Sequence, residues 1–284
     1  MSILMTVFNG DEFLIEALES LQAQTFQNWE LVVFEHGSTD SSLDLLRVWS
    51  DKRLILSTSE TNIGRTNALN TCLKMSRGQL IGVLDADDLS DSERIRKQVD
   101  FLIDNPKVGL VGSWSMVINE KGELIKAVRP PSTHAELVRA IAVNDPIIHS
   151  SMMFRRSLAE AVGGYNKDLK YGQDFGLLIE FAGISKIAVI EEPLCFWRVR
   201  SSSLTQDSSQ AIQRAIDEVH LFSRSAKLLS FTPSVRLKNY CKQFLVRSIL
   251  VYRLLRERRY RLSIIALLTP SSIYTDQEGR VLSR

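Results

Sequence analysis

The chain has 284 residues, 44% of them hydrophobic and 24% charged, so it can bury a sizeable globular core. Its three widely spaced cysteines argue against a disulfide framework and are typical of a reducing compartment. The net charge of +2 hides an acidic body and a basic C-terminal segment, because residues 224–284 hold 13 Lys/Arg against 3 Asp/Glu.

The N-terminal half is predicted to alternate strands with helices. Residues 2–8 form an apolar strand without a basic leader, so we expect no signal peptide, and no apolar run reaches the ~20 residues of a membrane span. Apolar spacing and capping residues predict further strands and intervening helices, namely strands at 30–34, 53–57 and 80–84 and helices at 12–24, 39–49, 65–75 and 90–105, the last with a capping box at Ser90–Glu93.

This alternation favours parallel pairing and an α/β sheet. Ligands of such sheets bind beyond the carboxyl ends of the strands. Polar residues follow three of the predicted strands, at 6–9, 35–38 and 85–88. We therefore expect these three segments to meet in one crevice.

The pattern changes after Pro106. A hairpin is predicted from 108–118 and 123–128, followed by helices at 134–143, 157–162 and 174–182, strands at 151–154 and 187–190, and mostly helix from residue 206. We therefore expect a mixed sheet flanked by helices. Its units would be residues 1–105, 106–205 and a basic helical extension at 206–284.

The strongest single chemical signal is an apolar strand that runs directly into three carboxylates, Asp85, Asp87 and Asp88. In an extended chain Asp85 and Asp87 point to the same side. Two such carboxylates can hold Mg²⁺ or Mn²⁺, which favour oxygen ligands and are often shared with substrate phosphates. The alternative is a solvated acidic turn that caps the next helix.

Several motifs in this order resemble those of family 2 glycosyltransferases, which have the GT-A fold. The resemblance covers about residues 2–205, and it is carried by Thr6–Gly10, Glu35–Asp40, Asn62–Gly64 with Asn67–Asn70, Asp85–Asp88, Val162–Tyr165, Gln173 with Asp174, and Trp197 with Arg198 and Ser201–Ser203. It implies an inverting, metal-dependent enzyme that moves a hexosyl or N-acetylhexosaminyl group from a nucleotide-diphosphate donor, expected to be a UDP-sugar. The acceptor would be a glycan or a lipid-linked glycan of surface polysaccharide synthesis.

The resemblance also assigns roles to residues of this chain. It makes Asp174 the general base, with a helix N-cap as the alternative, and Asp87 the ligand of Mn²⁺ or Mg²⁺. It places at the nucleotide Thr6, Val7, Phe8, Glu35, Arg65, Asn67, Asp85 and Ala86, and at the donor or acceptor sugar and diphosphate Asp88, His149, Arg198 and Arg200. The alternatives are a turn cap for Asp88, a structural histidine at 149 and a capped helix face for Arg65 and Asn67.

The chain departs from the family pattern at Glu35, His36, Gln173 and Arg200, and His36 replaces a second aspartate. Glu35 replaces an aspartate at the uracil site, which leaves the base less certain, and Gln173 replaces a glutamate beside the general base. Arg200 replaces a histidine associated with the metal or the diphosphate. Arginine cannot ligate a metal but can bind phosphate directly. The neighbouring His36 is interpreted as a solvent-facing turn residue.

Basic residues alternate with apolar ones in the C-terminal segment, notably at Arg236, Lys238, Lys242, Arg247, Arg253, Arg256, Arg258, Arg259 and Arg261. This pattern favours an anionic membrane surface, and hence a cytoplasmic protein peripheral to the inner face of the cell membrane. The alternative is a solvated helix packed on the body. No nucleic-acid motif is present, and we expect no nucleic acid as partner.

Two other functions stay open at this stage. A nucleotidyltransferase would also use carboxylates and Mg²⁺ on an α/β sheet, although residues 9–12 are acidic where a basic phosphate loop would be expected. A degenerate subunit that binds sugar nucleotides without turnover is suggested by Gln173 and Arg200. The intact acids Asp85, Asp87 and Asp174 oppose it.

Overall fold

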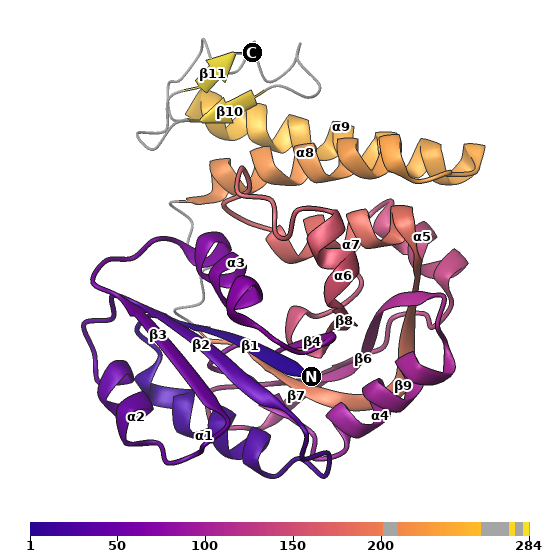
Figure 1. The fold of residues 1–284 in the computed structure, drawn as a ribbon. Coiled ribbons are helices and arrows are strands. Elements are labelled where there is room, and N and C mark those ends of the chain that lie inside the picture. The colour runs from indigo at the N-terminus through magenta and orange to yellow at the C-terminus, as the bar shows by residue number, and fades with distance from the viewer. Residues whose placement is uncertain (201–209, 257–272, 276–280, 284) are drawn as a thin grey trace.

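The protein is described by a computed structural model over residues 1–200, 210–256, 273–275 and 281–283. Its centre is a nine-stranded sheet with the order β3-β2-β1-β4-β8-β6-β9-β5, in which β7 pairs with β6 (Figure 1). The strands are β1 (Ser2–Val7), β2 (Glu30–His36), β3 (Leu54–Ser59), β4 (Leu80–Val83), β5 (Leu89–Ser90), β6 (Val108–Ile118), β7 (Leu124–Val128), β8 (Met153–Arg155) and β9 (Lys186–Arg198).

Helices cover both faces of the sheet. They are α1 (Asp11–Gln22), α2 (Ser42–Val48), α3 (Arg65–Met75), α4 (Arg94–Asp104), α5 (His134–Ile141), α6 (Arg156–Ala161) and α7 (Gln173–Ile184). The central strand β1 is apolar on both sides, so Leu4 belongs to a core with α3 and α7, whereas Ile3 and Met5 belong to a core with α1 and α4.

The predicted parallel pairing of the first half is confirmed. β1 runs parallel to β2 and to β4, and β2 runs parallel to β3. The connection from β3 therefore passes over β2 and β1 before the chain enters β4. The carboxyl ends of β1, β2 and β4 lie at the same edge of the sheet, which is the edge at which ligands bind in such folds.

Several predicted element boundaries are wrong. The capping box does not form: α4 begins at Arg94 without a side-chain cap, and Asp91 Oδ1 instead accepts the Glu93 N–H. The strand predicted at 187–190 is far longer in the structure. β9 continues to Arg198 because its second half pairs with β5 as well as with β6.

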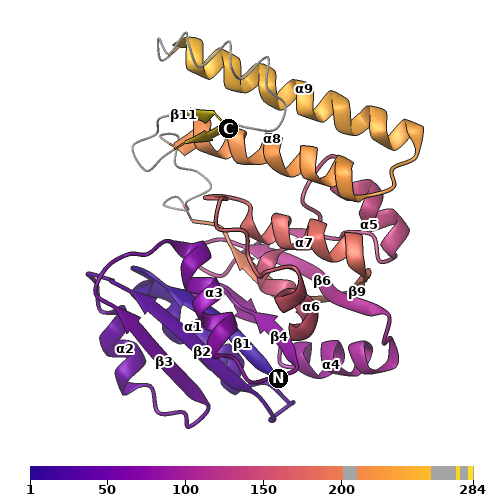
Figure 2. The ribbon, with the colours of Figure 1, turned by 45° about the horizontal axis from the view of Figure 1, so that its top comes forward.

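The C-terminal region adds helices α8 (Ala211–Leu228) and α9 (Pro233–Arg256), which lie side by side above α7 (Figures 1 and 2), and strands β10 (Ile273–Thr275) and β11 (Val281–Ser283). Phe222 of α8 packs on Phe175 of α7 with ring centroids 5.7 Å apart. On the other side of α8, Val246 and Leu250 of α9 are buried. Nowhere in the part of the chain that the structure describes is a helix both long and apolar enough to cross a bilayer.

A buried carboxylate fixes α8 to the loop that leads into α7. Asp217 Oδ2 accepts the backbone N–H groups of Lys170 and Tyr171, at 3.2 and 2.9 Å, and Oδ1 accepts an N–H of Gln213. Burial raises the pKa of Asp217 to about 6, against the opposing effect of these hydrogen bonds. This residue therefore couples the position of α8 to pH.

The substitution Asp217→Asn tests this coupling. A carboxyl with a raised folded-state pKa stabilises the fold below its ordinary value of 3.8, and this contribution is lost as the pH rises through about 6. Asparagine keeps an oxygen acceptor without the charge. Relative to this variant, the wild-type chain should therefore lose on the order of 2 kcal/mol of unfolding free energy between these two pH values.

The measurement is urea unfolding of both proteins at about pH 4 and about pH 7. The variant Asp217→Ala, which lacks the acceptor, should be less stable than Asp217→Asn at both pH values. A difference between wild type and Asp217→Asn that does not change with pH would rule out this role for the buried charge.

Candidate active site

The three polar segments that follow β1, β2 and β4 meet at one edge of the sheet, and we call this edge the crevice. Asp85, Ala86 and Asp87 follow β4, and Ala86 lies against Gly10, where the chain leaves β1 and enters α1. The carboxylates of Asp85 and Asp87 are both only about one-fifth exposed. The sequence thus places two neighbouring carboxylates in a partly desolvated position, where each needs a cation or donors.

Arg65, the first residue of α3, supplies the cation for Asp85. Its Nη2 lies 2.7 and 2.6 Å from the two oxygens of Asp85, and 3.2 Å from Nδ1 of His149. Nε2 of His149 lies 3.0 Å from the buried Tyr165 hydroxyl. Burial would raise the pKa of Asp85, but the charge of Arg65 and the contact with His149 outweigh it, and the pKa is lowered. Asp85 is therefore held ionised.

Arg200 supplies the cation for Asp87. Its Nε lies 3.0 Å from Asp87 Oδ2, close enough for an ion pair, although the angle does not make a hydrogen bond. Burial and then the charge of Asp85 raise the pKa of Asp87, and Arg200 opposes this rise. The two carboxylates are thus matched by two separate arginines.

Asp88 turns away from this pair into the protein. It is 1% exposed, accepts the Ser150 hydroxyl and accepts the backbone N–H of Arg198 at 2.8 Å. Ser150 in turn accepts the N–H of Asp85. Burial, followed by the charges of Asp85 and Asp87, raises the pKa of Asp88 well above its ordinary value. Asp88 therefore holds the motif to β9 and to the segment around Ser150.

Arg198 has the same inward orientation. Its guanidinium donates to the carbonyl oxygens of Asp87 at 3.0 Å and Glu120 at 3.1 Å, and to the Glu16 carboxylate at 2.7 Å. Its side chain is 1% exposed. The predicted contact between Arg198 and the substrate stays a prediction. The observed contacts make it a positioning residue for Asp87.

The ends of β1 and β2 form the second part of the crevice. Glu35 is buried and accepts the backbone N–H of Ser38 at 2.6 Å. Phe8 is 42% exposed and its ring stacks on His36 at a centroid distance of 5.4 Å. The prediction that His36 faces solvent is wrong: it is buried, and Nδ1 lies 3.0 Å from Asn62 Oδ1. An exposed flat ring beside a buried carboxylate suits a planar heterocycle.

Asp174 reaches the crevice from α7. The helix begins after Gly172, which has a φ of 66° and serves as N-cap, so the alternative in which Asp174 is the N-cap is wrong. Asp174 lies in the first helical turn and is half-buried. Its charge acts on Arg65 and on Asp145. It therefore lies on the same side as the Asp85–Arg65 pair.

The other residues predicted to bind the nucleotide lie partly in β1 and partly on α3. Thr6 and Val7 lie in β1 opposite β2, with Val7 paired to Glu35. Asn67 is exposed on α3, and its side chain donates to the Ile63 carbonyl oxygen. Ser150 and Asp145 lie in none of the predicted motifs. The hydrogen bond between Ser150 and Asp88, and the effect of the Asp174 charge on Asp145, depend on the tertiary packing of distant segments.

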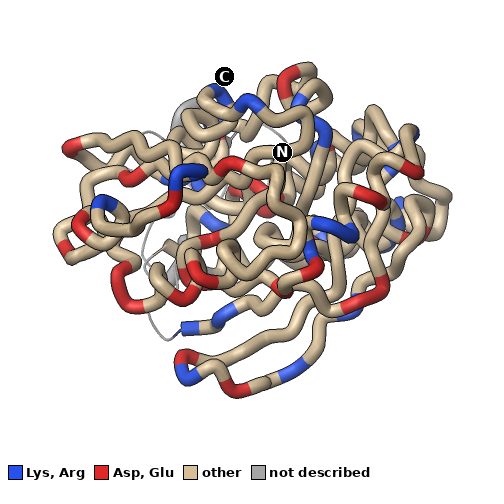
Figure 3. The backbone as a smooth tube through the Cα atoms, turned by 60° about the horizontal axis from the view of Figure 1, so that its bottom comes forward, with Lys and Arg blue, Asp and Glu red and all other residues tan. Residues whose placement is uncertain are grey.

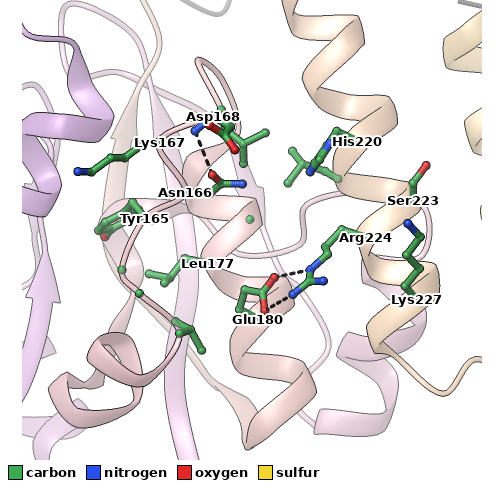
Figure 4. Close-up of a pocket in the computed structure, with 16 residues that line it drawn as sticks. Tyr165, Asn166, Lys167, Asp168, Leu177, Glu180, His220, Ser223, Arg224 and Lys227 are labelled. Atoms are coloured by element: carbon green, nitrogen blue, oxygen red, sulfur yellow. Dashed lines mark hydrogen bonds and ion pairs between the residues drawn. The ribbon is translucent and has the colours of Figure 1, made fainter. Parts of the chain in front are cut away.

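A cavity of about 640 Å³ lies between α7, α8 and the segment 162–169 (Figure 4). The ion pair between Glu180 and Arg224 closes part of its wall, with Nε 2.7 Å from Oε1. None of the predicted site residues lines this cavity. Acidic and basic positions are both spread over the body (Figure 3). The predicted site residues therefore lie at the carboxylate crevice and not at this cavity.

Comparison with known proteins defines the class. The sequence model of glycosyl transferase family 2 matches residues 2–163, more than half of the chain, and the chain therefore belongs to this family. An uncharacterised glycosyltransferase of Methanocaldococcus jannaschii is 28% identical over 204 residues, 70% of each chain. The putative glycosyltransferase EpsE of Bacillus subtilis is 30% identical over 167 residues, 58% of this chain and 59% of its own.

Solved structures share the fold. The mannosyltransferase PcManGT of Pyrobaculum calidifontis, in complex with GDP-Man and Mn²⁺, has a TM-score of 0.63 at 20% identity and covers 94% of this chain and 73% of its own. S. aureus TarS 1-349 in complex with UDP-GlcNAc has a TM-score of 0.63 at 15% identity and covers 100% and 96%. The predicted GT-A fold, with a mixed sheet flanked by helices and a helical C-terminal region, is confirmed.

Proposed function

We propose that the protein is an inverting glycosyltransferase that moves a sugar from a UDP-sugar to a glycan or lipid-linked glycan acceptor. One observation carries the proposal: the Asp85–Asp87 motif after β4 and Asp174 of α7, which come from separate segments, all lie close enough to Arg65 for their charges to raise the pKa of its guanidinium. Such a transfer needs one carboxylate that binds the donor, one that binds the metal and one that acts as base, all close together. We also propose that the chain has three units: residues 1–105 bind the donor, residues 106–205 bind the acceptor, and residues 206–284 form the C-terminal extension.

The donor nucleotide is proposed to bind along the ends of β1, β2 and β4. The base would lie by Phe8 and Glu35: the Phe8 ring is exposed and stacks on His36, the residue that follows Glu35 in β2. Asp85 is ionised and can accept hydrogen bonds from ribose hydroxyls. The structural relatives carry UDP-GlcNAc in one case and GDP-Man in another, so the uracil assignment depends on Glu35.

The oxygen ligands of this site suit a divalent cation that also binds the phosphates of the sugar nucleotide. Asp87 is the one carboxylate of the motif that accepts no hydrogen bond from Arg65 or from the backbone N–H of another residue, and oxygen is the ligand that Mn²⁺ and Mg²⁺ prefer. No cluster of three acidic, histidine or cysteine side chains that could hold a metal occurs among the described residues. Asp87 would therefore hold the cation together with phosphate oxygens. When bound, the cation neutralises charge on the leaving diphosphate.

Asp174 is proposed as the general base. It lies in the first turn of α7, near Arg65. A carboxylate that takes the proton of the acceptor hydroxyl raises the nucleophilicity of that oxygen as it attacks opposite the leaving diphosphate. Attack from that side inverts the anomeric carbon.

Turnover on a panel of UDP- and GDP-sugars tests this function, with release of the nucleoside diphosphate as readout. Release from a UDP-sugar supports the proposal. Binding without release from any donor or acceptor would favour the degenerate subunit. Release of pyrophosphate from a nucleoside triphosphate would favour the nucleotidyltransferase.

A lipid-linked acceptor would lie in a membrane. The second part of the proposal is therefore that α9 docks on an anionic membrane at the cytoplasmic face during surface polysaccharide synthesis. α9 buries one face on α8 and exposes apolar side chains on the other, namely Leu237, Tyr240, Phe244, Leu245, Ile249 and Tyr252. Exposed Arg236 and Lys238 flank this face. An apolar stripe between basic side chains suits anionic lipid, into which the apolar groups can insert. The basic positions 258, 259 and 261 lie outside the described residues.

The double substitution Leu237→Ser and Phe244→Ser tests this docking in the full chain. Loss of two inserted apolar side chains should weaken binding to phosphatidylglycerol vesicles by at least about tenfold, because each buried side chain contributes roughly 1.5–3 kcal/mol. Flotation with vesicles measures it. Ile103→Ser, at an equally exposed apolar site on α4, is the matched control. Equal binding of wild type and the double variant would refute docking through this face.

A further inference from the structure

We propose that Arg200 competes with the divalent cation for Asp87, so that this arginine sets the metal affinity of the donor site. The inference rests on the proposed function, because it takes Asp87 as the metal-binding carboxylate. It assigns to Arg200 two alternative partners, the Asp87 carboxylate and the diphosphate of the donor.

The geometry places Arg200 on the carboxylate that a cation would use. Arg200 Nε lies 3.0 Å from Asp87 Oδ2, and the two side chains are 21% and 23% exposed. The arginine is further placed by Phe13, whose ring centroid lies 5.7 Å from its Cζ. Since the pair is shielded from most of the solvent, the attraction is screened less than that of a surface ion pair.

The other carboxylates of the motif have partners of their own. Asp85 is held by Arg65 through both oxygens, and Asp88 is buried against Ser150 and the Arg198 backbone. A cation that enters the motif therefore has Asp87 as its available carboxylate. It must either displace Arg200 or share that carboxylate with a fixed positive charge.

Displacement has a second consequence. A guanidinium released from Asp87 is a planar, always charged donor group, and it suits the oxygens of a diphosphate. Arg200 would then neutralise part of the charge for which the cation would otherwise be needed. We therefore infer that UDP binding depends only in part on metal in the wild-type chain and strongly on metal once Arg200 is neutral.

The experiment measures binding of Mn²⁺ itself, from the signal of free Mn²⁺ in electron paramagnetic resonance, with and without saturating UDP. Arg200→Gln should bind Mn²⁺ about tenfold more tightly than wild type, an effect between that of a charge pair in bulk water and that of a pair near a protein surface. Its UDP affinity without metal should fall. Arg200→Lys, which keeps the charge, should stay near wild type in Mn²⁺ affinity.

Two variants complete the design. Arg47→Gln removes the same charge from the exposed face of α2 and should leave Mn²⁺ affinity unchanged. Asp87→Asn should abolish the tight binding gained in Arg200→Gln. Equal or weaker Mn²⁺ affinity in Arg200→Gln, with UDP still bound normally, would overturn the competition and leave the donor site intact. Failure of all proteins to bind UDP would overturn the proposed function and this inference together.

Discussion

Replacing Asp174 by asparagine should reduce sugar transfer by about 10³-fold while leaving UDP affinity within about twofold of wild type. Asparagine keeps the size and polarity of the side chain but cannot accept the proton of the acceptor hydroxyl. Nucleotide contacts are proposed to come from β1, β2 and β4, so α7 should contribute little to binding of UDP. The measurement is release of UDP from the productive donor, together with a UDP titration.

Glu180→Gln gives a matched control for this substitution. It removes the same charge from the same helix, but Glu180 pairs with Arg224 at the wall of the cavity and not in the crevice. Its turnover should stay within about twofold of wild type. A variant Asp174→Asn with normal turnover would mean that another group takes the proton, and Asp145 would be the next candidate.

Replacing Arg198 by alanine should lower the free energy of unfolding by about 3 kcal/mol or more. The guanidinium is buried and satisfies the carbonyl oxygens of Asp87 and Glu120, and its loss leaves these acceptors without a donor. The substitution also removes the hydrogen bond that holds the Asp87 backbone in place, so the affinity for UDP should fall as well. Urea unfolding followed by circular dichroism measures the first effect.

Arg96→Ala is the control for the Arg198 prediction. Arg96 is an exposed arginine with its Cζ 4.7 Å from the Phe26 ring centroid, so its removal should change the unfolding free energy by no more than about 0.5 kcal/mol. Arg198→Lys should not restore stability, because an ammonium group cannot reach both carbonyl oxygens and Glu16 together. Equal unfolding midpoints for the two alanine variants would contradict the assigned role.

Local patterns in the sequence predict the parts of the fold that depend on neighbouring residues. The apolar run before Asp85 is a strand because both of its faces are buried, and the alternation of strands with helices predicts the parallel pairing of β1 with β2 and β4. The start of α4 could not be predicted from its capping motif, because Asp91 binds the Glu93 N–H locally instead. The length of β9 depends on pairing with β5, which no local pattern indicates.

The pairing of charges in the crevice could not be predicted from the sequence. The motif predicts that Asp85 and Asp87 are neighbours, but not that each has its own arginine, because Arg65 and Arg200 come from α3 and from the end of β9. The same holds for Asp88 and Arg198, which the resemblance places at the sugar and diphosphate. Both are buried, and the Asp88 carboxylate accepts the backbone N–H of Arg198. Tertiary packing, not spacing, decides which charges face the crevice.

Calorimetric titration of UDP into the purified protein, with and without Mn²⁺ and beside GDP, tests the central claim most directly. The proposed donor site predicts that UDP binds more tightly than GDP, and that Mn²⁺ increases its affinity. No binding of UDP in either condition, or a clear preference for GDP, would contradict the assignment of Glu35, Asp85 and Asp87 to a UDP-sugar.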